Sequence, residues 1–124
     1  QSFYKNNKKP ILLFGCGGDR DKNKRKIMGL IANKYASKVY ITDDNPRNES
    51  PSKIRKDILK YCPSGIEIAG RKNAIKKAIK KLEINDILII AGKGHEKVQI
   101  IKKKKLKFDD YNIVKNCKYH QNTL

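Results

Sequence analysis

Short, wholly apolar runs alternate with longer amphipathic stretches, and this alternation is the feature that most constrains the fold. Ile11–Phe14 and Ile87–Ala91 are apolar at every position, which is typical of strands buried on both faces of a sheet. Two further strands are expected at Lys38–Thr42 and Ile66–Ala69, and helices at 24–35, 52–61 and 72–82. Strands separated by helices of this length form right-handed parallel βαβ units. We therefore predict a single α/β domain with a doubly wound, Rossmann-like, mostly parallel sheet.

Apolar residues recur at helical spacing in the first and third predicted helices. The first is expected to be capped by Asp21 or Asn23. After Gly94 the pattern changes, and a C-terminal β-hairpin is expected from Val98–Ile101 and Leu106–Phe108, followed by a short helix from Asp109 or Asp110. We expect residues 1–10 to be a linker or frayed tail, 11–117 the domain, and 118–124 a second tail. The apolar positions are Ile27, Met28, Leu30, Ile31 and Tyr35 in the first helix, and Ile75, Ala78, Ile79 and Leu82 in the third.

The charge is strongly basic, with 30 Lys and Arg against 12 Asp and Glu, a net charge of +18. Nucleic-acid binding is one hypothesis, because basic side chains displace counterions from phosphates. However, the lysines are spread over every predicted helix, and five arginines are few for reading bases. An A+T-rich genome explains the abundance of Lys, Asn and Ile equally well. We therefore expect no nucleic-acid partner.

Cellular location is indicated by three negative features of the sequence. No stretch approaches the roughly 20 apolar residues of a membrane span, so no membrane association is expected. The first ten residues contain no apolar core of a signal peptide. Cys16, Cys62 and Cys117 are odd in number and lack metal-ligand spacing, which favours free thiols in a reducing compartment. The cytoplasm is the expected location.

Three loops that follow predicted strands are rich in Gly, Asp, Asn, Arg and His. They are 15–21 (GCGGDRD), 43–47 (DDNPR) and 92–96 (GKGHE). Ligands of open α/β sheets bind outside the carboxyl ends of the strands, where these loops lie. We therefore expect a binding site there.

The first loop departs from a dinucleotide fingerprint, because Arg20 stands where the third glycine belongs. Its glycines still allow an anionic ligand to approach the backbone, and Arg20 offers a bidentate clamp for a carboxylate or phosphate. Alternatively, the glycines merely turn the chain and Arg20 pairs with Asp19 or Asp21.

In the second loop, Pro46 fixes its own φ and holds Asn45 extended. Such a stiff loop can hold Asp44, Asn45 and Arg47 in an arrangement that matches a zwitterionic amino acid, with Arg47 for its carboxylate and the acid or amide for its ammonium. The alternative is an Asx-turn with Arg47 as a surface charge.

The third loop is not a phosphate-binding P-loop, because no Ser or Thr follows Lys93. His95 and Glu96 supply too few ligands for zinc, so no metal site is expected in this chain. We expect His95 to be structural, whereas Glu96 lies beside glycines that admit a ligand.

Together, in this order and at these spacings, GCGGDRD, TDDNPR and AGKGHE resemble the C-terminal domain of the Mur ligase family. The similarity is greatest to members that add the third residue of the peptidoglycan stem peptide. Supporting similarities are Lys24–Arg25, Met28, Gly70–Arg71, Gln99 and Phe108–Asp110, so the resemblance covers roughly residues 11–114.

The resemblance implies a full-length ligase that uses ATP and Mg²⁺ to join a diamino acid to UDP-MurNAc-L-Ala-D-Glu through an acyl phosphate. The DNPR form of the second loop implies meso-diaminopimelate. Carried over by motif, the diamino-acid site comprises Arg20, Asp44, Asn45, Pro46, Arg47, Gly92 and Glu96.

The family's P-loop, magnesium ligands and carbamylated lysine belong to its central ATPase domain, and none is found in these residues. We therefore expect no catalytic residue here and no ligation by the isolated chain. A stand-alone amino-acid-binding or docking module is the alternative.

Overall fold

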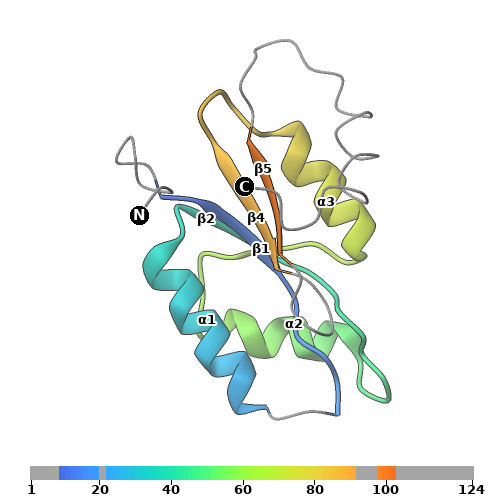
Figure 1. Cartoon of the computed structure of the whole chain (residues 1–124). Coiled ribbons are helices and arrows are strands. Elements are labelled where there is room, and N and C mark those ends of the chain that lie inside the picture. Colours follow the sequence, from blue (N-terminus) through green and yellow to red (C-terminus); the bar gives the residue numbers. More distant parts are fainter. Residues whose placement is uncertain (1–8, 20–21, 92–97, 103–124) are drawn as a thin grey trace.

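The structure is a computed structural model that describes residues 9–19, 22–91 and 98–102. Helices and strands alternate along the chain as the sequence predicts (Figure 1). Among the described residues, no helix is long and apolar enough to cross a membrane. The elements are β1 (Ile11–Phe14), α1 (Asn23–Tyr35), β2 (Lys38–Ile41), α2 (Pro51–Leu59), β3 (Ile66–Glu67), α3 (Arg71–Lys80), β4 (Ile87–Ala91) and β5 (Val98–Lys102).

The five strands form one sheet in the order β3-β2-β1-β4-β5. Its first four strands are parallel, and β5 pairs with β4 in the antiparallel direction. The chain thus runs outward from β1 to β3 and then returns to β4 on the other side of β1. This is a doubly wound α/β sheet, as predicted, and the reversal of strand order lies between β1 and β4.

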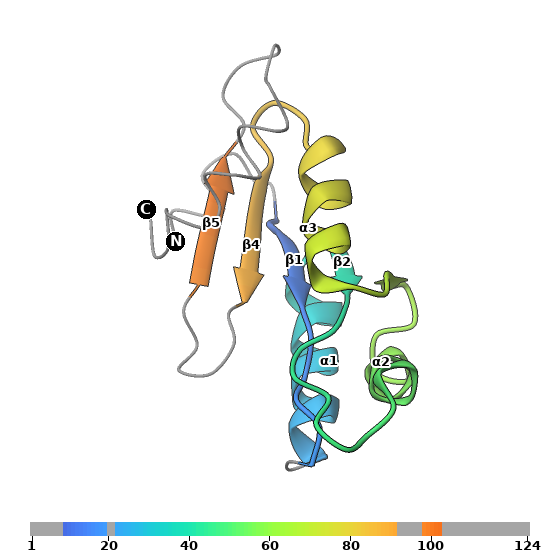
Figure 2. The same ribbon diagram turned by 90° about the vertical axis from the view of Figure 1, so that its right-hand side faces the viewer.

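Helices cover the two faces of the sheet separately (Figures 1 and 2). On one face, α3 buries a core that includes Leu13, Ile79 and Leu88. On the other, α1 and α2 bury a core that includes Phe14 and Ile58. The all-apolar runs seen in β1 and β4 are needed because their residues alternate between these two cores.

Helix boundaries differ slightly from the predicted ones. The N-cap of α1 is Lys22 and no side chain caps it, so Asn23 is the first helical residue and not its cap. In α2, Pro51 occupies the first turn and the hydroxyl of Ser50 accepts a hydrogen bond from the backbone N–H of Lys53. The hairpin expected with Leu106–Phe108 lies outside the described residues, whereas β5 itself pairs with β4.

The apolar residues of α1 are arranged differently from a simple inward-facing stripe. The helix buries Arg25, Gly29 and Ala32, while Met28 packs partly buried against the core. Ile27, Leu30, Ile31 and Tyr35 are each about half exposed, at 47, 48, 47 and 50%. Helical spacing predicted the helix correctly, but it did not indicate which face the sheet and α2 would cover.

Candidate functional site

The candidate site lies at the edge of the sheet where the parallel strands β1, β2 and β4 end. Residues 15–19 follow β1 and residues 42–50 follow β2 at this edge. The loop after β4 lies outside the described residues. Because the strand order reverses between β1 and β4, this edge is where an open α/β sheet binds ligands.

The first two loops are in direct backbone contact. The N–H of Gly18 donates to the carbonyl oxygen of Asn45 at 2.7 Å. A Cβ atom on Gly18 would lie 1.8 Å from the carbonyl oxygen of Pro46, so the approach requires glycine. The side chain of Arg47 donates back to the carbonyl oxygen of Gly18 at 2.9 Å. The glycines of the first loop therefore serve close packing of one loop on the other.

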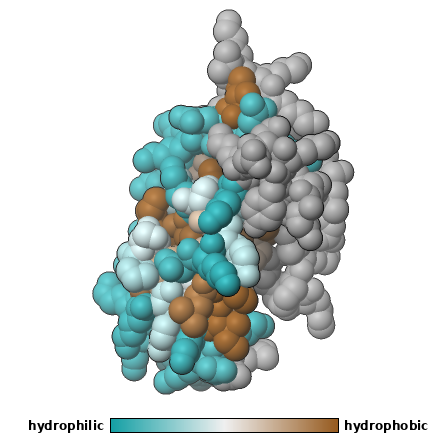
Figure 3. All heavy atoms as spheres, turned by 90° about the vertical axis from the view of Figure 1, so that its left-hand side faces the viewer, coloured by the Kyte–Doolittle hydropathy of each residue, from teal (hydrophilic) through white to brown (hydrophobic). Residues whose placement is uncertain are grey.

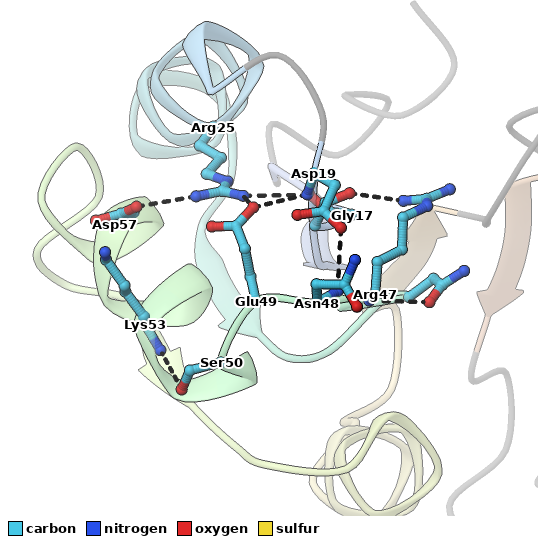
Figure 4. A network of polar contacts seen from close by, with 11 residues as sticks. Gly17, Asp19, Arg25, Arg47, Asn48, Glu49, Ser50, Lys53 and Asp57 are labelled. Carbon is cyan, nitrogen blue, oxygen red and sulfur yellow. Dashed lines mark hydrogen bonds and ion pairs between the residues drawn. The ribbon is translucent and has the colours of Figure 1, made fainter.

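Arg25 anchors both loops from the first turns of α1 (Figure 4). Its guanidinium donates to Glu49 at 2.6 Å and to Asp57 at 3.0 Å, and a longer contact of 3.4 Å reaches the carbonyl oxygen of Gly17. The side chain is only 2% exposed. Lysine could not span these three acceptors at once, whereas the planar fork of arginine can. Arg25 thus holds α1, α2 and the loop after β2 in one arrangement.

Acceptors in the two loops complete this network. The carboxylate of Glu49 also accepts from the backbone N–H of Asp19 at 2.7 Å, and the carboxylate of Asp19 accepts from the N–H of Asn48 at 3.1 Å. The hydrogen bond from Arg25, with that of the Asp19 N–H, lowers the pKa of Glu49 to about 2. Asp19 and Arg47 both adopt positive φ, 53° and 50°, where non-glycine residues are strained. The strained backbone is held by these contacts.

A second network fixes the start of the loop after β2. Arg55, which is buried in α2, donates to Asp43 at 2.5 Å and to Glu67 at 2.9 Å. The other carboxylate oxygen of Asp43 accepts from the N–H of Gly70 at 2.7 Å. These contacts connect Asp43 to α2, to the end of β3 and to the start of α3. They therefore fix the position of the residue directly before Asp44.

Arg71 lies between the ends of β2 and β4. Its guanidinium donates to the carbonyl oxygen of Asp43 at 3.4 Å and to that of Ala91. Burial lowers its pKa, and the nearby charge of Asp44 opposes that effect. Within the described residues, therefore, this half-buried cation has carbonyl acceptors and a neighbouring carboxylate but no ion pair. A positive charge in this position is suited to attract an anionic ligand.

The predicted site residues fall into two groups. Asp44, Asn45, Pro46 and Arg47 lie together in the loop after β2, whereas Arg20, Gly92 and Glu96 lie outside the described residues. The side-chain oxygen of Asn45 accepts a hydrogen bond from the backbone N–H of Arg47 at 3.2 Å. This is the Asx-turn that the sequence offered as the alternative interpretation of the second loop. Asp44 is partly buried, and its one described hydrogen bond comes from the N–H of Asn45 at 2.7 Å.

Arg47 was predicted as a site residue, but sequence reasoning missed the structural contributions of three other arginines at this edge. Arg25, Arg55 and Arg71 hold the loops and helices that surround the strand ends, whereas the lysines mostly lie on the surface. A signal was available in the composition. In a chain whose cations are overwhelmingly lysine, an arginine indicates a position where a planar guanidinium is favoured, and each of the four arginines that the structure describes donates hydrogen bonds through that group.

No group of three or more His, Cys, Asp and Glu residues able to hold a metal ion occurs in the part of the chain that the structure describes. Cys16 and Cys62 are free and buried. Burial raises the pKa of Cys16 to about 11, so its thiol stays protonated and is a poor ligand or nucleophile.

Comparison with known proteins identifies the class that this sheet and its loops define. The family described as "Mur ligase, glutamate ligase domain" matches residues 1–94. The chain belongs to this family, which confirms the resemblance noted in the three loops.

Individual proteins that resemble this chain share one more specific name. A UDP-N-acetylmuramoyl-L-alanyl-D-glutamate--2,6-diaminopimelate ligase from Anaplasma marginale is 50% identical over 110 residues, covering 88% of this chain and 23% of the relative. The ligase of the same name from Rickettsia montanensis is 54% identical over 112 residues, covering 86% and 22%. A solved structure of a ligase with this name matches with a TM-score of 0.66 and 39% identity, covering 88% of this chain and 23% of that one. The chain thus spans about a quarter of the length of these relatives.

Proposed function

We propose that this chain is the C-terminal, amino-acid-presenting domain of an ATP-dependent ligase. The ligase adds meso-diaminopimelate to UDP-MurNAc-L-Ala-D-Glu. The observation that carries the proposal is the grouping of Asp44, Asn45 and Arg47 beside Arg71 at the sheet edge where such folds bind ligands. The names of the relatives supply the identity of the amino acid.

The chemistry of the edge suits a diamino dicarboxylic acid. Asp44 offers a carboxylate to an ammonium group, and the charges of Arg47 and Arg71 favour a carboxylate. Arg20, Gly92 and Glu96 complete the proposed site, and Glu96 with the adjacent glycines would hold the distal ammonium and carboxylate that distinguish diaminopimelate from lysine. The loop contacts described above fix Arg47 in place before the ligand arrives, which reduces the entropy lost on binding.

The contribution of the domain is positioning. ATP activates a carboxylate as an acyl phosphate, and this domain would bring the amino group to it by closing onto the central ATPase domain. ATP and Mg²⁺ are assigned to that other domain, as the resemblance to the family implies. The isolated chain is therefore expected not to ligate, and the complete ligase is expected in the cytoplasm.

A substitution in an intact ligase tests the site. The enzyme is made by joining this chain to the N-terminal and central parts of the Anaplasma marginale relative. Asp44→Asn removes the charge proposed to hold an ammonium group, and we expect the KM for meso-diaminopimelate to rise at least tenfold while the KM for ATP is unchanged. The control is Glu83→Gln, which removes an exposed charge after α3, far from the strand ends. Equal changes in both KM values would show that Asp44 does not contact the amino acid.

Calorimetry on the 124-residue chain separates the leading proposal from a stand-alone module. Binding of meso-diaminopimelate to the chain alone indicates a complete site in this domain. Binding only after the central domain is added indicates a site shared between domains.

A further inference from the structure

The two strands that lead to the loops of the proposed amino-acid site, β2 and β4, are not neighbours in the sheet. Strand β1 lies between them and pairs with both. On the β2 side, the N–H of Thr42 donates to the carbonyl oxygen of Phe14 at 2.9 Å. On the β4 side, Ile90 is the last residue in register with β1. Asp43 and Ala91 therefore stand just beyond these two ladders, and their separation is set by contacts outside the ladders.

The guanidinium of Arg71 contacts both of these residues. It donates through Nη1 to the carbonyl oxygen of Asp43 at 3.4 Å and through Nη2 to that of Ala91. Arg71 is the first residue of α3, and in Figure 2 this helix begins at the end of the sheet toward which β1, β2 and β4 point. A single planar group therefore reaches across the end of β1 and joins the ends of β2 and β4.

Asp43 is a firm point of attachment, because its carboxylate is also held. One carboxylate oxygen accepts from Arg55 at 2.5 Å, and the other accepts from the backbone N–H of Gly70 at 2.7 Å. Gly70 directly precedes Arg71, so the start of α3 is tied to Asp43 by a backbone N–H as well as by the guanidinium. Since both carboxylate oxygens of Asp43 are engaged within the protein, Asp44 is the acid of this pair that is available to a ligand.

The burial of Arg71 distinguishes it from the many surface cations. Every lysine among the described residues is exposed, and Figure 3 shows hydrophilic residues over much of one side of the molecule. Arg71 is half-buried instead, and this burial lowers its pKa because the charged form loses hydration. An apolar side chain would fill the same space without that cost. The two carbonyl contacts therefore indicate a role that needs the fork of a guanidinium.

We propose that Arg71 is a positioning residue for the diamino acid. It fixes the end of β2, which leads to Asp44, relative to the end of β4, which leads to Gly92. A diamino dicarboxylic acid carries charged groups at both of its ends, so the protein groups that hold those ends must keep one separation. A misplacement of about 1 Å can weaken such a site severely. The inference rests on the proposed function, because it concerns the same amino-acid site, and it gives the geometry of Arg71 a role besides that of its charge.

Two substitutions test this role in the ligase made by joining this chain to the N-terminal and central parts of the Anaplasma marginale relative. Arg71→Met removes the charge and the donors, whereas Arg71→Lys keeps a positive charge but replaces the planar fork by one ammonium group. We expect the KM for meso-diaminopimelate to rise about tenfold in both variants, and the KM for ATP to stay within about twofold. The matched control is Lys72→Met, which removes an exposed charge from the same turn of α3 and should change neither KM by more than about twofold.

The outcomes separate the geometry of Arg71 from its charge and from stability. A raised KM for meso-diaminopimelate in both variants supports the proposal. A normal KM in Arg71→Lys would show that charge alone matters, and it would overturn the proposal. A fall in kcat with an unchanged KM would overturn it too, because partial unfolding removes active enzyme without weakening the site. If only Asp44→Asn raises this KM, the inference fails and the proposed function stands, whereas no effect from either residue removes both.

Discussion

The guanidinium of Arg25 and the carboxylate of Glu49 lie 2.6 Å apart, and this ion pair joins α1 to the loop that follows β2. Around it, Asp19, Asn48 and Asp57 complete a network that spans two helices and two loops. The network places no group directly on a ligand. The network instead holds the loop after β2 in place. Arg47, which directly precedes Asn48 in this loop, is therefore fixed at the edge of the sheet.

Removing the centre of this network should cost considerable stability. Arg25→Ala leaves Glu49 and Asp57 without their common partner, and we expect the free energy of unfolding to fall by about 3 kcal/mol. Arg25→Lys should recover only part of this loss, because an ammonium group cannot reach both carboxylates with the same geometry. Urea unfolding measures the effect, with the exposed neighbour Lys24→Ala as a control expected within about 0.5 kcal/mol. Comparable losses for Arg25→Ala and Lys24→Ala would show that the network is not a structural anchor.

Stability should also depend on pH through Glu49. Its pKa in the folded chain, about 2, lies below the ordinary 4.5 because Arg25 and the Asp19 N–H stabilise the carboxylate. A lowered pKa stabilises the folded state above about pH 4.5, and that contribution is lost as the pH falls toward 2. Glu49→Gln should therefore be less stable at pH 7 and show a flatter dependence of stability between pH 5 and 2. An unaltered slope in thermal unfolding across this range would contradict the assignment.

Much of the fold follows from the sequence, because the all-apolar runs of β1 and β4 allow few other structures. The packing of α1 did not follow, for its buried face includes Arg25 and Gly29. Arg25 is buried only because partners from α2 and from the loop after β2 meet it, and Gly29 because α2 approaches closely. Both depend on residues more than 20 positions away, which a local pattern does not reveal.

The candidate site, like the fold, was predicted from the sequence only in part. The residues of the loop after β2 were recognised from their types and spacing. The contributions of Arg55 and Arg71 were missed, because their carbonyl and carboxylate partners come from separate elements. That Gly18 is required for contact with Pro46, and not only for a turn, also depends on tertiary structure.

The contact at Gly18 gives a direct test of loop packing. Gly18→Ala places a Cβ against the backbone of Pro46, which neither loop can relieve without moving, and we expect a loss of about 3 kcal/mol. Gly70→Ala is the control, since its nearest neighbour would lie 3.7 Å away and only the positive φ of 82° is unfavourable. That substitution should cost about 1–2 kcal/mol. If urea unfolding ranks the two in the opposite order, the loops are not packed as described.

The amino-acid specificity of the chimaeric ligase tests the central claim most directly. In the enzyme that combines this chain with the N-terminal and central parts of the Anaplasma marginale relative, phosphate release is measured with meso-diaminopimelate or with L-lysine as the acceptor. We predict a kcat/KM at least 100-fold higher for meso-diaminopimelate. A folded chimaera that uses lysine equally well, or better, would contradict the proposal that this domain selects the diamino acid.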